Sequence, residues 1–226
     1  MIRIPARARL VAAGLLLLAL GGCKKVVEPE NVAALTLVSG DLQVRQASRA
    51  LRSPLVFRAT SAAGTGVAGA AITLVVVQGG GAVDSASVRT DANGEARVKW
   101  TLGPESGQAL LATVIGATPL RVTATGIVPS DIVVAQGSNQ SARVGVALLN
   151  NVVIRVLGAN NTPMDSVNVT FQITSGGGAI APQSALTNAS GEATVKWTMG
   201  PIAGANTASV RAATIDPVTI NANATP

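Results

Sequence analysis

The residue whose chemistry is most readable in this sequence is Cys23, the one cysteine among 226 residues. A thiolate is a soft nucleophile, so Cys23 is suited to thioether formation, whereas a lone cysteine cannot close an internal disulfide. It follows Gly21 and Gly22, and two small residues let the backbone enter the cleft of a signal peptidase. Cys23 is therefore a candidate for modification through its thiol.

The residues before Cys23 have the pattern of an export signal. Residues 1–9 carry Arg3, Arg7 and Arg9 without an acidic residue, and residues 10–20 form an apolar run, LVAAGLLLLAL. A helix needs about 20 apolar residues to cross a bilayer, so this run is too short. The sequence therefore predicts a signal helix that is removed, rather than a transmembrane anchor.

Residues 20–23, Leu-Gly-Gly-Cys, resemble the lipobox of bacterial lipoproteins, in which the cysteine is lipidated and becomes the mature N-terminus. The resemblance implies a lipid on Cys23 as the membrane anchor. Each buried methylene contributes about 0.8 kcal/mol, so the three acyl chains of such lipoproteins make attachment effectively permanent. In such lipoproteins an aspartate directly after the lipidated cysteine favours retention in the inner membrane. Lys24 occupies that position here, so the resemblance implies the outer membrane. The alternative is an ordinary secretory signal in which Cys23 is incidental.

A second candidate site is residues 91–95, Asp-Ala-Asn-Gly-Glu, which offer carboxylates and an amide as calcium ligands. Calcium takes six to eight oxygens, more than this segment supplies. A similar segment later in the chain, residues 188–191, begins with Asn188 and so lacks the first carboxylate. A hairpin or corner turn that uses Gly94 and Gly191 is therefore the favoured interpretation.

The triple glycines at residues 79–81 and 176–178 could be read as phosphate-binding loops, but no Gly-Lys-Ser or Gly-Lys-Thr follows them. We interpret them as flexible strand exits. The chain has no histidine, so it lacks the usual triad base and any imidazole metal ligand, and lipidation would consume its only thiol. The sequence thus predicts a protein that is not an enzyme and that holds no cofactor or metal.

The composition favours β structure. Hydrophobic residues make up 48% of the chain and aromatic residues only 2%, so the core must consist of Val, Ile, Leu and Ala. The net charge of +6 would suit a nucleic acid or a membrane. Much of that charge lies in residues 1–25, however, and no run of like charge occurs from residue 31 onward. We expect no nucleic-acid partner.

The sequence contains two copies of one domain, offset by 97 residues. Residues 94–101 (GEARVKWT) match residues 191–198 (GEATVKWT), and the triple glycines match at the same offset. A period of this length suits a whole sandwich domain rather than a solenoid repeat. We expect the following parts: a signal peptide over residues 1–22, a lipidated tether over 23–31, one Ig-like domain over 32–128 and another over 129–226.

Apolar residues alternate with polar ones in the strands. The alternation predicts an inward face of Ala96, Val98, Trp100 and Leu102 in the first copy, and of Ala193, Val195, Trp197 and Met199 in the second. Further β-prone runs are residues 35–38, 54–60, 72–77, 120–125, 132–135, 152–157, 167–174 and 218–221. The predicted fold class is all-β, with two tandem immunoglobulin-like β-sandwich domains after an N-terminal signal helix.

Residues 39–41 (SGD), 54–56 (PLV), 79–81 (GGG), 90–96 (TDANGEA) and 102–103 (LG), in that order, resemble the bacterial Ig-like domain of group 1. This module is repeated in intimins and invasins, where it forms a rigid rod between a membrane barrel and a receptor-binding tip. In the present sequence a lipid replaces the barrel, so the resemblance implies a spacer or display role.

The copies are joined by residues 127–130 (IVPS), in which Pro129 restricts the backbone, so we expect a stiff pair. The leading hypothesis is a membrane-anchored cell-envelope lipoprotein whose Ig-like modules act as a structural spacer or adhesion module. The alternative is a periplasm-facing glycan- or protein-binding module. In that case the loops at residues 62–66 and 160–164 would carry the contacts.

Overall fold

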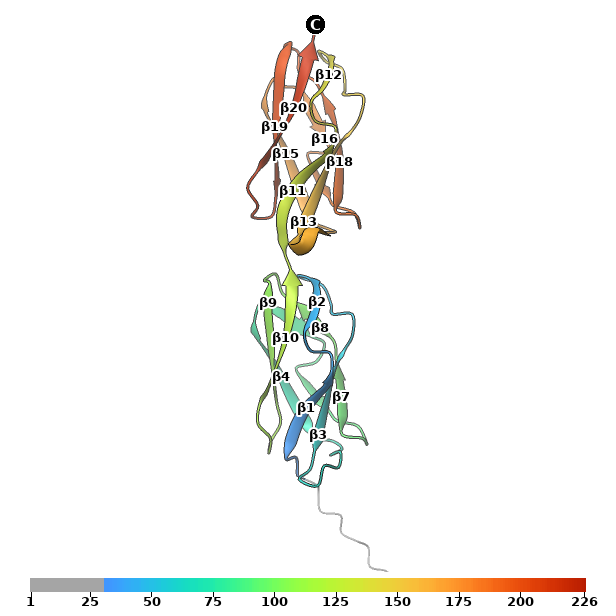
Figure 1. Cartoon of the computed structure of the whole chain (residues 1–226), viewed down its shortest axis with the longest axis vertical. Coiled ribbons are helices and arrows are strands. Elements are labelled where there is room, and N and C mark those ends of the chain that lie inside the picture. Colours follow the sequence, from blue (N-terminus) through green and yellow to red (C-terminus); the bar gives the residue numbers. More distant parts are fainter. Residues whose placement is uncertain (1–30) are drawn as a thin grey trace, which may run out of the picture. The chain divides into compact units, whose positions relative to one another are not determined.

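The computed structural model describes residues 31–226, which fold into two β-sandwiches (Figure 1). This confirms the predicted fold class for the described residues. Strands β1 to β10 form the first sandwich. Their bounds are β1 (Ala34–Ser39), β2 (Gln43–Gln46), β3 (Leu55–Thr60), β4 (Ala71–Gln78), β5 (Gly81–Val83), β6 (Ser87–Arg89), β7 (Glu95–Val98), β8 (Trp100–Leu102), β9 (Gly107–Thr113) and β10 (Leu120–Ile127).

The second sandwich repeats the arrangement of the first. Its elements are β11 (Pro129–Gln136), β12 (Gln140–Arg143), β13 (Val152–Gly158), the 3₁₀ turn η1 (Ala159–Asn161), β14 (Thr162–Pro163), β15 (Asn168–Ser175), β16 (Ala179–Ala181), β17 (Ser184–Leu186), β18 (Glu192–Thr198), β19 (Gly204–Ala212) and β20 (Val218–Thr225). Within residues 31–226, η1 is the only helical element.

Each sandwich packs a five-stranded sheet against a second sheet (Figure 1). The five-stranded sheet has the order β2-β10-β9-β4-β6 in the first copy and β12-β20-β19-β15-β17 in the second. In both copies the first strand of that order pairs parallel with the second, and the other neighbours pair antiparallel. The repeat in the sequence therefore corresponds to a repeat in topology.

The opposing sheets of the two copies differ in the continuity of one strand, and the short strand β14 is present only in the second copy. In the second copy β18 is continuous and pairs with both β13 and β16. In the first copy the matching strand is interrupted at Lys99, so β7 pairs with β3 and β8 pairs with β5. At the interruption the Lys99 N–H donates to Asp84 Oδ1 at 3.1 Å, and the Asp84 N–H donates to the Lys99 carbonyl at 3.0 Å. The Asp84 carboxylate thus takes the place of a backbone acceptor in the hydrogen-bond ladder between the two strands.

Each sandwich has its own hydrophobic core, and a tryptophan is its largest fully buried side chain. Trp100 is 1% exposed and Trp197 is 0% exposed. The other six residues predicted to face inward with them, Ala96, Val98, Leu102, Ala193, Val195 and Met199, are all buried, which confirms the predicted alternation. The other buried side chains of the two cores are mainly Val, Ile, Leu and Ala, with one phenylalanine in each.

Candidate functional site

Cys23, the predicted lipidation site, lies outside the described residues together with the predicted signal peptide. Its modification stays a prediction. In the part of the chain that the structure describes, no helix combines the length and the apolar character needed to cross a bilayer.

The segment from Asp91 to Glu95 is a tight turn between β6 and β7. Asp91 Oδ1 accepts hydrogen bonds from the backbone N–H groups of Asn93 at 2.8 Å and Glu95 at 2.9 Å. The Gly94 N–H donates to the Asp91 carbonyl at 3.0 Å, and Gly94 has a φ of +77°. The carboxylate oxygen is thus occupied by the turn's own backbone, as in an Asx-turn. This confirms the turn interpretation.

The second copy builds the same turn with an amide. Asn188 Oδ1 accepts from the N–H groups of Ser190 at 2.9 Å and Glu192 at 3.0 Å. The neutral amide oxygen of Asn188 therefore accepts the same hydrogen bonds as the Asp91 carboxylate. The turn requires a hydrogen-bond acceptor at this position rather than a negative charge. Across residues 31–226, no group of three acidic or cysteine side chains is placed to share a metal ion.

The triple glycines link the two sheets of each sandwich. Residues 79–81 have φ values of +82°, +73° and +90°, and residues 176–178 have +81°, +69° and +91°. A Cβ on Gly81 would lie 2.3 Å from the Thr101 carbonyl oxygen, and one on Gly178 would lie 2.2 Å from that of Thr198. These segments are strand exits as predicted, and at Gly81 and Gly178 they pass close to the backbone of the facing strand.

The two loops expected to carry ligand contacts have different surroundings. Residues 62–66 form an exposed turn after β3, in which the Ser61 N–H donates to the Thr65 carbonyl at 2.9 Å. Residues 160–164 instead run from η1 through β14 to Met164, which is fully buried. Asp165, the next residue, contacts the first sandwich, so part of this loop belongs to the junction between the copies.

That junction is short and contains polar contacts between the two sandwiches, in addition to Ile127, which packs against the second core. Val128 alone separates β10 from β11. Arg49 Nη2, in the first sandwich, donates to Asp165 Oδ2 at 2.6 Å and to Ser166 Oγ at 2.8 Å in the second. Gln46 Nε2 donates to the Asp165 carbonyl at 2.7 Å. The sequence interpretation missed these residues, although Arg49 and Asp165 are positions at which the two copies differ.

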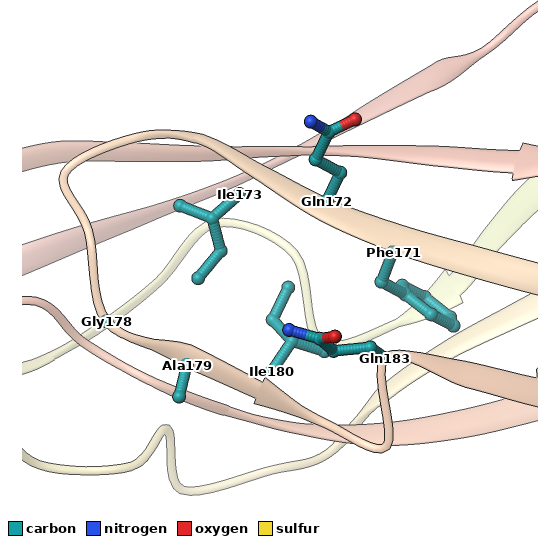
Figure 2. Close-up of a pocket in the computed structure, with 7 residues that line it drawn as sticks. All are labelled: Phe171, Gln172, Ile173, Gly178, Ala179, Ile180 and Gln183. Atoms are coloured by element: carbon teal, nitrogen blue, oxygen red, sulfur yellow. The ribbon is translucent and has the colours of Figure 1, made fainter.

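A groove of about 370 Å³ lies between β15 and β16 in the second sandwich (Figure 2). Ile173 and Ile180 extend into the space between the two strands, while Gln172 points away from it, and Gln183 also lines the groove (Figure 2). None of its seven lining residues is ionisable, so the groove offers apolar contact and amide hydrogen bonds but no acid or base. The matching positions of the two glutamines in the first copy are Val75 and Ala86.

No family model matches the sequence, and no curated protein matches it. The solved structures that are similar to the chain include the following three. The D0-D1 domain of intimin is 16% identical, with a TM-score of 0.35, over 85% of this chain and 97% of that one. The Yersinia pseudotuberculosis adhesin InvE is 18% identical, with a TM-score of 0.44, over 85% and 59%. Invasin, described as a bacterial integrin-binding protein, is 20% identical, with a TM-score of 0.43, over 85% and 40%.

Proposed function

We propose that this chain is a cell-envelope lipoprotein, anchored by lipid on Cys23, whose two Ig-like modules act as a structural spacer or adhesion module. In this proposal residues 1–22 are removed, residues 23–31 are the tether, and the modules span residues 32–128 and 129–226. The modules are not catalytic and meet a protein or glycan ligand, while the lipid places them at the envelope, in the outer membrane.

The observation that carries the spacer role is the junction. One residue, Val128, connects β10 to β11, and the Arg49 guanidinium is bonded to both Asp165 and Ser166 across it. A Gly- or Ser-rich connection would let two domains move independently. A single connecting residue with direct polar contacts instead restricts their relative motion, which is what a spacer requires.

Metabolic labelling with an alkyne-bearing fatty acid tests the anchor. The wild-type chain should incorporate the label and partition with membranes. Cys23→Ser removes the only thiol and should lose both properties, with the precursor retaining its signal peptide. Label on the Cys23→Ser protein would disprove the anchoring proposal.

Protease treatment of intact cells separates the two placements of the modules. Surface display predicts that external protease degrades the modules while a periplasmic marker stays intact. If the modules are cleaved only after the outer membrane has been opened, adhesion to other cells is excluded. A periplasm-facing role with a glycan or protein partner then replaces it.

A further inference from the structure

Three arginines in the first sandwich, Arg45, Arg49 and Arg52, have no counterpart in the second copy. The copies align at this point because Gln43 and Gln140 make the same contacts. Gln43 Nε2 donates to the carbonyls of Gly40 at 2.9 Å and Ser53 at 3.0 Å. Gln140 Nε2 donates to those of Gly137 at 2.8 Å and Asn150 at 2.9 Å. The residues that match the three arginines are Ala142, Val146 and Leu149.

Arg45 and Arg52 line a hollow of about 390 Å³ at the junction of the two sandwiches. Gln46 also lines it from the first sandwich, and Thr162, Pro163 and Asp165 line it from the second. Its volume lies within the range of small-molecule sites, about 300–1,000 Å³. The site is therefore large enough for a single sugar residue.

The charge of this hollow is positive. Asp165 is the one acidic residue that lines it, and its carboxylate is already paired with Arg49 at 2.6 Å. Arg45 and Arg52 form no hydrogen bond or ion pair through their guanidinium groups within residues 31–226. Arg45 and Arg52 thus line the hollow without a carboxylate to neutralise them.

Arg45 provides a second, independent observation, because its Nε atom is buried and has no hydrogen-bond partner. A buried donor that lacks an acceptor is unfavourable, and for a charged group the penalty is larger than for a neutral one. An oxyanion is the acceptor that guanidinium groups bind best, since its oxygens match the planar array of N–H donors.

We propose that this hollow binds an acidic sugar residue, with Arg45 and Arg52 holding its carboxylate. Gln46 donates through Nε2 to the Asp165 carbonyl at 2.7 Å, and its Oε1, which has no hydrogen-bond partner within residues 31–226, can accept from a sugar hydroxyl. Val44, Ile127 and Pro163 add apolar surface against which the C–H face of a sugar ring can pack. The site goes beyond the spacer role and does not depend on lipidation of Cys23.

NMR of the full chain with ¹⁵Nε-labelled arginine tests this site directly. The Arg45 Nε–H is buried, so its proton should exchange slowly enough to give a resolved signal. Sodium glucuronate should shift the Arg45 and Arg52 signals saturably, with a dissociation constant on the order of 1 mM for a ligand of this size. Glucose and inorganic phosphate, at the same ionic strength, are the comparison ligands.

Arg45→Gln and Arg52→Gln should each weaken glucuronate binding by about tenfold or more, because each removes one charged contact. Neither side chain has a partner within the described residues, so the other arginine signals should keep their positions. Arg211→Gln, an exposed arginine on β19, is the matched control and should bind like the wild type.

Three results would overturn the assignment: no saturable shift with glucuronate, equal binding of glucose, or unchanged binding in both variants. Phosphate that binds as tightly as glucuronate would show a general anion site and would likewise overturn the sugar assignment. The fatty-acid labelling of Cys23 is a separate measurement, so failure of one proposal is distinguishable from failure of the other.

Discussion

Asp91 and Asn188 occupy the same position in the two copies and accept the same pair of backbone hydrogen bonds, at distances of 2.8–3.0 Å. The two residues have nearly the same shape but differ in charge. The second copy thus shows that the turn before β7 and β18 depends on an oxygen acceptor at this position.

Asp91→Asn should therefore change the free energy of unfolding by less than about 0.5 kcal/mol, whereas Asp91→Ala should lower it by about 1–2 kcal/mol. The alanine variant loses both acceptor contacts, and the asparagine variant keeps them. Urea denaturation followed by circular dichroism measures both values. Equal destabilisation by the two substitutions would show that the negative charge is required after all.

Gly81→Ala should destabilise the first sandwich by about 3 kcal/mol or more. Its φ of +90° disfavours any side chain, and the new Cβ would lie 2.3 Å from the Thr101 oxygen. Gly80→Ala is the matched control, since its φ is +73° but its nearest neighbour, Pro104 Cδ, is 3.4 Å away. This variant should lose only about 1–2 kcal/mol from backbone strain. Similar losses in thermal denaturation would argue against close packing at Gly81.

The two copies differ in how an amide supports the glycine connection. Gln108 is 2% exposed and accepts from the Gly103 N–H at 3.0 Å while donating to the carbonyls of Gly79 at 3.1 Å and Glu105 at 2.6 Å. Asn206, which lies against Gly176, donates to the Gly204 carbonyl at 3.0 Å, and its buried Oδ1 has no partner.

Gln108→Ala should consequently destabilise the chain by about 2–4 kcal/mol, because it removes the four hydrogen bonds of this amide and leaves buried backbone groups unpaired. Asn206→Ala should have an effect of about 1 kcal/mol or less, since the lost hydrogen bond is offset by removal of an unpaired oxygen. Chemical denaturation of the two variants gives the comparison. A larger loss for Asn206→Ala would contradict this account.

Trp197→Ala should destabilise the second sandwich by about 3–5 kcal/mol, the usual effect of emptying a core position of this size. It leaves Trp100 as the only tryptophan, so fluorescence then reports the first sandwich alone. Because the two cores are separate, the fluorescence midpoint should stay near the wild-type value while circular dichroism detects an earlier transition. A common shift of both signals would show that the sandwiches unfold as one unit.

The Arg49–Asp165 ion pair should contribute little to stability, because the side chains are 38% and 41% exposed. A double-mutant cycle with Arg49→Ala and Asp165→Ala should give a coupling energy of about 0.2–1 kcal/mol that decreases with added salt. The Arg97–Glu95 pair, at 3.4 Å and with Arg97 67% exposed, is the control and should give a value near zero. A salt-independent coupling would argue that the pair is not electrostatic.

The sequence predicted the strands whose apolar residues alternate. Residues 72–77 and 167–174 correspond to β4 and β15, which share the same burial pattern. The central strands β9 and β19 were missed. In β9 the consecutive residues Gln108, Ala109 and Leu110 are all buried, so no period of two is visible. In β19 the buried positions include Asn206 and Ala208, which carry little hydrophobic signal.

The candidate site was less predictable than the fold. The Asp91 turn could be predicted, because its residues are adjacent in the sequence. Arg49 and Asp165 are 116 residues apart, and only the three-dimensional arrangement brings them together. The sequence feature that could have identified these residues is the set of positions at which the two copies differ. A charged residue in one copy that matches an apolar residue in the other, such as Arg52 and Leu149, indicates a position that the fold does not require.

Both members of the Arg49–Asp165 pair are specific to one copy. Thr90 and Thr187 donate to the carbonyls of Val67 and Met164, which identifies Ala68 as the counterpart of Asp165. If a gene rearrangement exchanged the two copies, Val146 would take the place of Arg49, and Ala68 that of Asp165. Both cores would survive such an exchange, but the ion pair would not form. The contact between the two modules therefore depends on their order along the chain, whereas their cores do not.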